Sequence, residues 1–117
     1  MQFDQFTIAL LVLRPDAAEM DDAAATALQD AHMAHLADLH DAGYLVAAGP
    51  LLGPPEREFR GLSILTVDPA RAKALKEQDP AVLAGRFSVQ FFPWIVPAGA
   101  MSFAHTRFPR SMADTET

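Results

Sequence analysis

Four histidines, His32, His35, His40 and His105, are the residues of this chain best suited to acid–base chemistry. An imidazole changes its charge near neutral pH, so a histidine beside a bound molecule can take up a proton and return it. Three of the four lie within residues 32–40, in a run rich in alanine and leucine that favours a helix. The face of the helix that each ring occupies then decides what the ring can do.

His35 is the histidine whose spacing directs it toward the protein interior. It recurs at helical intervals with Leu28, Ala31 and Leu39, and together they form one apolar stripe. A polar ring on such a stripe needs a hydrogen-bond partner, because burying the ring unpaired costs free energy. Two readings follow: a structural histidine bonded to a backbone carbonyl, or a proton-transfer residue oriented by a carboxylate.

Asp79 is the carboxylate that we consider for that second reading. Asp79 followed by Pro80 is a typical helix N-cap, and capping alone would explain the residue. Alternatively, its second oxygen reaches His35, fixes the ring tautomer and makes the other ring nitrogen a better base. Tyr44, Arg60 and Ser63 are further polar candidates that nothing in the sequence singles out.

His32 raises the possibility of a metal site, because an i, i+3 histidine pair with His35 can bind zinc if a third protein ligand is present. No other histidine or acid is locally placed to complete the set, so we predict no metal site and no cofactor. The chain has no cysteine, which excludes disulfides and thiolate metal sites. Without G-x-S-x-G, Walker or G-x-G-x-x-G motifs, a serine nucleophile and nucleotide sites have no support.

Stretches of alternating or continuous apolar residues, divided by glycine and proline, predict the elements that would position these side chains. The expected strands are residues 3–13, 44–48, 60–67 and 87–96, and the expected helices are residues 20–42, 70–78 and a turn at 80–84. This order predicts an α+β fold, a ferredoxin-like β-α-β-β-α-β antiparallel sheet with its helices on one face.

The second face of this sheet would be bare, and we expect a second copy of the chain to cover it in a homodimer. The apolar run Ile8–Leu13 and the alternating Phe87, Val89 and Phe91 motivate this expectation. We expect residues 1–97 to form one domain and residues 98–117 a C-terminal tail, ordered only if it docks on something.

Charge and composition limit the partners. The formal net charge is −6, with no cluster of basic residues along the sequence, which disfavours nucleic acid and anionic membrane surfaces. The N-terminus lacks a positively charged segment, and the apolar run Phe6–Leu13 is too short for a signal peptide or a membrane span. We therefore expect a cytoplasmic protein whose partner is a small molecule.

Three segments, in this order, resemble the YciI-like (YCII-related) family. They are AHL with LHDAGYL in residues 34–45, AAGP in residues 47–50, and QDPAVLAG in residues 78–85, with Pro93-Trp94 closing the last strand. The resemblance implies a dimeric α+β barrel and a small-molecule enzyme with a His–Asp pair, which by match is His35 and Asp79.

One branch of this family, the chloromuconolactone dehalogenases, eliminates HCl from a lactone, whereas most members have no assigned reaction. Many relatives have an arginine where this chain has His32, so the resemblance does not carry an anion-binding role to that position. The tail after Pro97 also extends beyond the usual end of the domain.

We therefore expect a small-molecule enzyme in which His35 is the general acid or base and Asp79 orients it. Its substrate would be a small organic molecule with a carbonyl or carboxylate, and elimination, isomerisation or hydrolysis would suit a lone imidazole without a cofactor. The alternative is a non-catalytic ligand-binding or assembly module in which the pair is a structural hydrogen bond. Because the fold alone cannot decide, the discriminating feature is a cavity that reaches the free nitrogen of His35.

Overall fold

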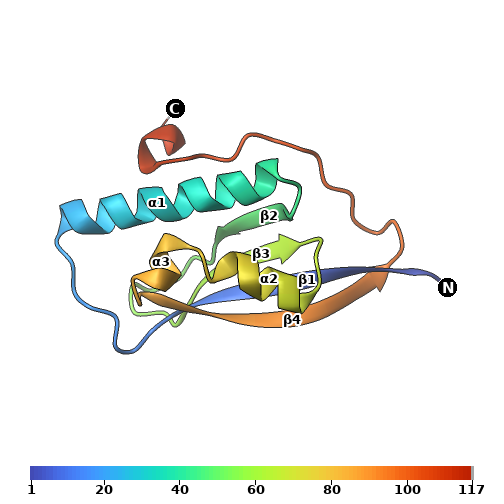
Figure 1. Cartoon of the computed structure of the whole chain (residues 1–117), viewed down its shortest axis with the longest axis horizontal. Coiled ribbons are helices and arrows are strands. Elements are labelled where there is room, and N and C mark those ends of the chain that lie inside the picture. Colours follow the sequence, from blue (N-terminus) through green and yellow to red (C-terminus); the bar gives the residue numbers. More distant parts are fainter. Residues whose placement is uncertain (117) are drawn as a thin grey trace.

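The computed structural model describes residues 1–116 and confirms the predicted α+β fold (Figure 1). The elements along the chain are β1 (Phe3–Leu13), α1 (Asp22–Asp41), β2 (Leu45–Pro50), β3 (Phe59–Leu65), α2 (Pro69–Lys76), α3 (Pro80–Leu83), β4 (Phe87–Pro97) and the 3-10 helix η1 (Met112–Thr115). No helix within residues 1–116 is both long and apolar enough to cross a lipid bilayer.

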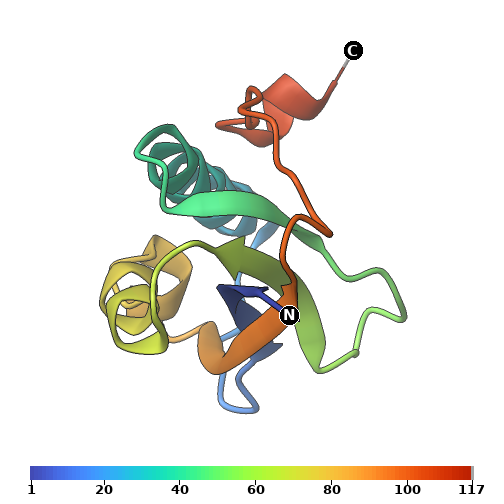
Figure 2. The same cartoon turned by 90° about the vertical axis from the view of Figure 1, so that its right-hand side faces the viewer.

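The four strands form one antiparallel sheet in the order β2-β3-β1-β4, the order of a ferredoxin-like fold. The long strands β1 and β4 lie side by side along their whole lengths, from Phe3 opposite Pro97 to Leu13 opposite Phe87. The helices lie on one side of this sheet (Figure 2). The sheet thus presents one face to the helices and leaves the other without helical cover.

Short sequence signals set the element boundaries as expected. Asp68 caps α2 by accepting the Arg71 N–H, and Pro69 occupies the first helical turn. Gly43 ends α1 with a φ of +87°, a backbone conformation that glycine adopts without strain. These local rules account for the agreement between the predicted and observed elements within a few residues.

The buried face of α1 differs from the predicted stripe. Its buried residues are His32, Met33, Ala37, Leu39 and His40, whereas Leu28, Ala31 and His35 are only partly buried. The reason is that α1 is covered twice, by the sheet and by the C-terminal tail. The predicted apolar stripe assumed contact with the sheet alone, and it therefore does not coincide with the buried face of α1.

The β4 residues that motivated the dimer face also lie elsewhere. Phe87 is buried, and Val89 and Phe91 pack against the core under the helices. Their neighbours Phe92 and Trp94 are 46% and 37% exposed. The alternating set that we assigned to a partner thus belongs to the protomer core, because successive side chains of a strand point to opposite faces.

Candidate active site

A cavity of about 460 Å³ lies between α1, the sheet and the C-terminal tail. This volume falls within the roughly 300–1,000 Å³ of small-molecule sites. Apolar side chains form much of its wall, among them Met33 and Leu36 of α1, Leu11 of β1, Val89 of β4 and Phe108 of the tail. Its polar residues are His32, Ser63, Lys76, Gln29, Thr115 and the arginines Arg57, Arg60 and Arg86.

His32 and Asp79 form a buried pair at the wall of this cavity. The His32 Nδ1 and Asp79 Oδ2 atoms are 2.6 Å apart, and Asp79 is 0% exposed. Burial favours the neutral carboxyl, but the hydrogen bond and charge of His32, together with the Ala81 N–H, outweigh it and hold the pKa of Asp79 below its usual value. The carboxylate therefore accepts, and the His32 Nδ1–H donates.

The second ring nitrogen of His32 is not sealed by the protein. Within residues 1–116, Nε2 makes no hydrogen bond, and no fully buried side-chain nitrogen or oxygen lacks a partner. Nε2 is therefore accessible, and His32 is one of the cavity-lining residues. In the neutral form of the ring that has its proton on Nδ1, Nε2 carries the lone pair that could take a proton from a bound molecule.

The start of α3 holds Asp79 in place. Its Oδ1 accepts the Ala81 N–H at 2.9 Å, which confirms the predicted N-cap, while Oδ2 is left for the histidine. The helices α1 and α3 pack against each other, so the capping residue of the short helix meets the middle of the long one. One carboxyl thus caps α3 and orients a ring.

The predicted bond between His35 and Asp79 is wrong. His35 donates from Nε2 to the Leu75 carbonyl oxygen at 3.2 Å, the structural arrangement that we had kept as the other reading. Its half-buried ring has a lowered pKa, mainly because burial disfavours the charged form. His32 and His35 are about 60° apart on the helical wheel at 100° per residue, and the ring nearer α3 takes the carboxylate.

Lys76 is a second buried charge at the cavity, and the sequence did not indicate it. It is 2% exposed, and its Nζ donates to Ser63 Oγ at 2.8 Å. Burial lowers the pKa of Lys76 to about 8, against the opposing charge of Asp79. An ammonium without a carboxylate partner in such a place is costly, and a bound anion would relieve that cost.

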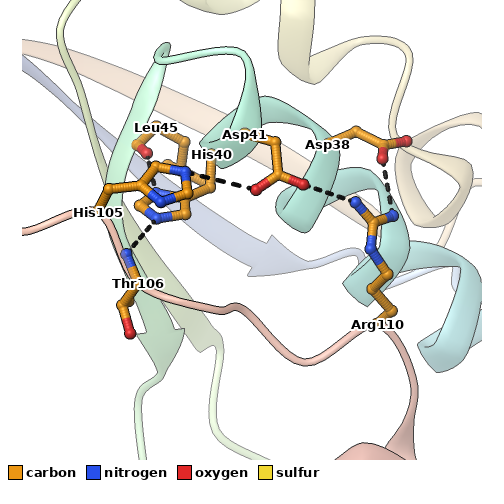
Figure 3. A network of polar contacts seen from close by, with 7 residues as sticks. All are labelled: Asp38, His40, Asp41, Leu45, His105, Thr106 and Arg110. Carbon is orange, nitrogen blue, oxygen red and sulfur yellow. Dashed lines mark hydrogen bonds and ion pairs between the residues drawn. The ribbon is translucent and has the colours of Figure 1, made fainter.

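The C-terminal tail, here residues 98–116, docks on α1 of its own protomer and closes one wall of the cavity. The Arg110 guanidinium bonds both Asp38 and Asp41 at 2.8 Å (Figure 3). The rings of His40 and Phe108 stack with centroids 4.0 Å apart. Phe103 packs edge-on against Phe6. The tail is therefore ordered by docking, and the surface on which it docks belongs to its own chain.

His40 is the centre of this docking contact. Its Nδ1–H donates to the Leu45 carbonyl oxygen at 2.7 Å, and its Nε2 accepts the Thr106 N–H at 3.1 Å. The two bonds require a neutral ring with its proton on Nδ1. His105 stacks on the same ring at 4.6 Å. Two of the four histidines thus hold the tail, outside the set of cavity-lining residues (Figure 3).

A family model of the YCII-related domain matches residues 7–95 of this chain. The chain belongs to the YCII-related family. The match covers the His32–Asp79 pair and most of the four strands, whereas the tail residues that line the cavity lie outside it.

A solved relative has the same YCII-like fold. It is the 5-chloro-2-hydroxyhydroquinone dehydrochlorinase of Burkholderia phenoliruptrix AC1100 in complex with 2,5-dihydroxybenzoquinone. The sequences are 21% identical over 76% of this chain and 92% of the relative, with a TM-score of 0.53. A comparison with curated proteins gives no match.

Of the further candidates named from the sequence of this YCII-related protein, two line the cavity. Arg60 and Ser63 do so, whereas Tyr44 packs against the core beneath Arg71. Sequence reasoning missed Lys76, because it stands beside Glu77 and Gln78 like an ordinary surface lysine. Within residues 1–116, no three histidine, aspartate or glutamate side chains converge as metal ligands.

Proposed function

We propose that this protein is a small-molecule enzyme in which His32, oriented by Asp79, transfers protons in the cavity. The observation that carries the proposal is the 2.6 Å contact between His32 Nδ1 and the buried Asp79, with Nε2 left accessible. A carboxylate on one imidazole nitrogen fixes the tautomer and stabilises the imidazolium that forms when the other nitrogen takes a proton.

The arrangement suits reactions in which one group removes a proton and returns it elsewhere. In an elimination, His32 Nε2 would take a proton from carbon while the leaving group departs from the neighbouring carbon with its electron pair. In an isomerisation, the same nitrogen would return the proton to another atom. The relative named as a dehydrochlorinase makes elimination the first reaction to test.

The test is a turnover screen with hydroxylated and chlorinated ring compounds and lactones, read by mass spectrometry and chloride release. With any substrate found, His32→Gln should lower kcat at least a hundredfold, the usual contribution of a general base. Asp79→Asn should lower it less, because the ring stays in place. Both variants should keep a cooperative unfolding transition.

His35 as the catalytic histidine remains a prediction, and the matched variant His35→Gln decides it. On the present proposal His35→Gln keeps most of the activity, because its Nε2 is engaged by the Leu75 carbonyl. If His35→Gln abolishes turnover and His32→Gln does not, the assignment of the base is reversed. If turnover is found but no variant changes it, the pair is structural and the proposal fails. If the screen finds no turnover at all, the alternative of a ligand-binding or assembly module is favoured.

A further inference from the structure

The cavity concentrates positive charge in an acidic protein. The chain carries a net charge of −6, yet four of its 9 lysines and arginines line this one cavity, namely Arg57, Arg60, Lys76 and Arg86. No aspartate or glutamate is among the residues that line it. Folding thus creates a basic cluster that the sequence order does not display.

None of these four cations forms an ion pair within residues 1–116. The ion pairs found there involve other lysines, arginines and histidines. Asp79, the nearest buried acid, is committed through both oxygens, to His32 and to the Ala81 N–H. The positive charge of the cavity is therefore not neutralised by a salt bridge in the described part of the chain.

Two of the arginines are held by backbone oxygens. Arg57 donates from Nε to the Leu51 carbonyl and from Nη1 to the Pro54 carbonyl. Arg60 donates from Nε to the Arg57 carbonyl and from Nη2 to the Pro55 carbonyl. Each guanidinium keeps one terminal nitrogen without a protein acceptor among these contacts. Positioned cations with unused donors are what an anion site needs.

The arginines also lie close enough to disfavour one another. The pKa of Arg60 is lowered by burial and then by the charges of Arg57 and Arg86, and only Glu56 opposes this. Glu56 is an exposed residue outside the cavity lining. A bound anion would relieve this mutual repulsion as well as the isolation of Lys76.

We infer that the ligand of this cavity is a small organic acid, whose carboxylate is bound by the unpaired cations that line the cavity, Lys76 first among them, while its apolar body packs against Met33, Leu36 and Phe108. The volume and the apolar walls argue for an organic body, and the unpaired cations argue for the anion. The inference rests on the proposed use of the cavity as the substrate site, but it concerns binding and not turnover.

The test compares isosteric charged and neutral probes. Benzoate and trans-cinnamate are titrated against benzamide and cinnamamide at low ionic strength, with binding followed by amide NMR shifts. We expect each acid to bind at least tenfold more tightly than its amide. Lys76→Met should weaken binding of the acids about tenfold or more, as for the loss of one charge-assisted hydrogen bond.

Lys73→Met is the matched control, since Lys73 lies one turn earlier in α2 and is exposed. It removes the same charge and should leave affinity nearly unchanged. Arg60→Gln and Arg86→Gln serve as second variants if Lys76→Met fails to fold. Four results would overturn the inference. Two concern the probes: neither acid binds, or acid and amide bind equally tightly. The other two are equal losses of affinity in Lys73→Met and Lys76→Met, and inorganic phosphate that binds as tightly as benzoate.

The inference about acid binding and the proposed enzyme function can be contradicted independently of each other. If His32→Gln binds benzoate like the wild type while the wild type turns over no compound, the inference stands and the proposed enzyme does not. If turnover is found only for uncharged compounds and the acids do not bind, the proposed function stands and the inference does not.

Discussion

Asp79 and His32 are joined across the contact between α3 and α1, with Oδ2 2.6 Å from Nδ1. The other oxygen of the same carboxyl caps α3 through the Ala81 N–H. The catalytic geometry that we propose and the start of a four-residue helix therefore depend on one side chain. Asparagine is the informative replacement, because it can still cap a helix but cannot carry the negative charge.

The stability that Asp79 provides should depend on pH in the acid range. A carboxyl whose pKa is lowered by folding stabilises the protein above its unfolded pKa of about 3.9, and this stabilisation is lost as the pH falls through the folded pKa. Asp79→Asn should cost roughly 3 kcal/mol at neutral pH. Denaturant unfolding of both proteins should show this difference shrinking below about pH 4. A difference that stays constant would contradict an ionised Asp79.

Lys76 should destabilise the fold below its own pKa. Its pKa falls from 10.5 to about 8 on folding, so the unfolded chain binds more protons between these values and stability rises with pH there. At about 1.4 kcal/mol per unit, the unfolding free energy of the wild type relative to Lys76→Met should rise by roughly 3 kcal/mol between pH 8 and 10.5. Lys73→Met, at an exposed site, should show no such trend.

Replacing the His40 ring should loosen the tail. The ring donates to the Leu45 carbonyl and accepts the Thr106 N–H, and His40→Leu removes both bonds while keeping a side chain of similar size. Hydrogen-exchange protection at Thr106 should fall about fivefold, as for one lost hydrogen bond.

The control for this prediction is His105→Leu, which removes the ring stacked on His40 but neither of the two His40 hydrogen bonds. Thr106 protection, corrected for intrinsic exchange, should be nearly the same in this variant as in the wild type. Unchanged protection in His40→Leu would show that His40 does not hold the tail.

Removing residues 98–117 should leave a folded domain, as the sequence predicts. The sheet and its helices are complete at Pro97, and the ion pairs of Arg110 are exposed and contribute little. Thermal unfolding of residues 1–97 should stay cooperative with a lowered Tm, because Phe108 no longer covers His40. Loss of the cooperative transition would place the domain boundary beyond Pro97.

The homodimer remains a prediction, with Ile8 kept on the dimer face and Phe92 taking the place of Phe87, Val89 and Phe91. Ile8 faces both Ile64 and Phe92 across the sheet, in a row on the side opposite the helices. Sedimentation at micromolar concentration should give a dimer for the wild type, and Phe92→Lys should shift it toward the monomer. Leu83→Lys adds the same charge at an exposed site of α3, on the helix side of the sheet, and is the matched control. A stable wild-type monomer would end the prediction.

The elements followed from the sequence because their signals are local. Asp68-Pro69, Asp79-Pro80 and Gly43 fix helix ends through neighbouring atoms, so they mark boundaries without knowledge of the fold. The fold class then followed from the order of the elements.

The candidate site could be predicted from the sequence only in part, because its contacts depend on how the helices pack. The sequence indicated Asp79 and a histidine on α1, but His32 and His35 share too much of one face for spacing to choose between them. Lys76 carries no signal at all, since only the docking of α2 on the sheet buries it. The structure of the tail, including η1, was not predicted. The tail sequence has no periodic apolar pattern, and its conformation depends on contact with α1.

Phe108, Pro109, Met112 and Thr115 all line the cavity, yet they follow β4 along the chain. During translation, the four strands therefore leave the ribosome before the residues that complete the cavity. A nascent chain can form the His32–Asp79 pair while its cavity still lacks one wall. The order of synthesis thus separates the assembly of the sheet from the closing of the binding site.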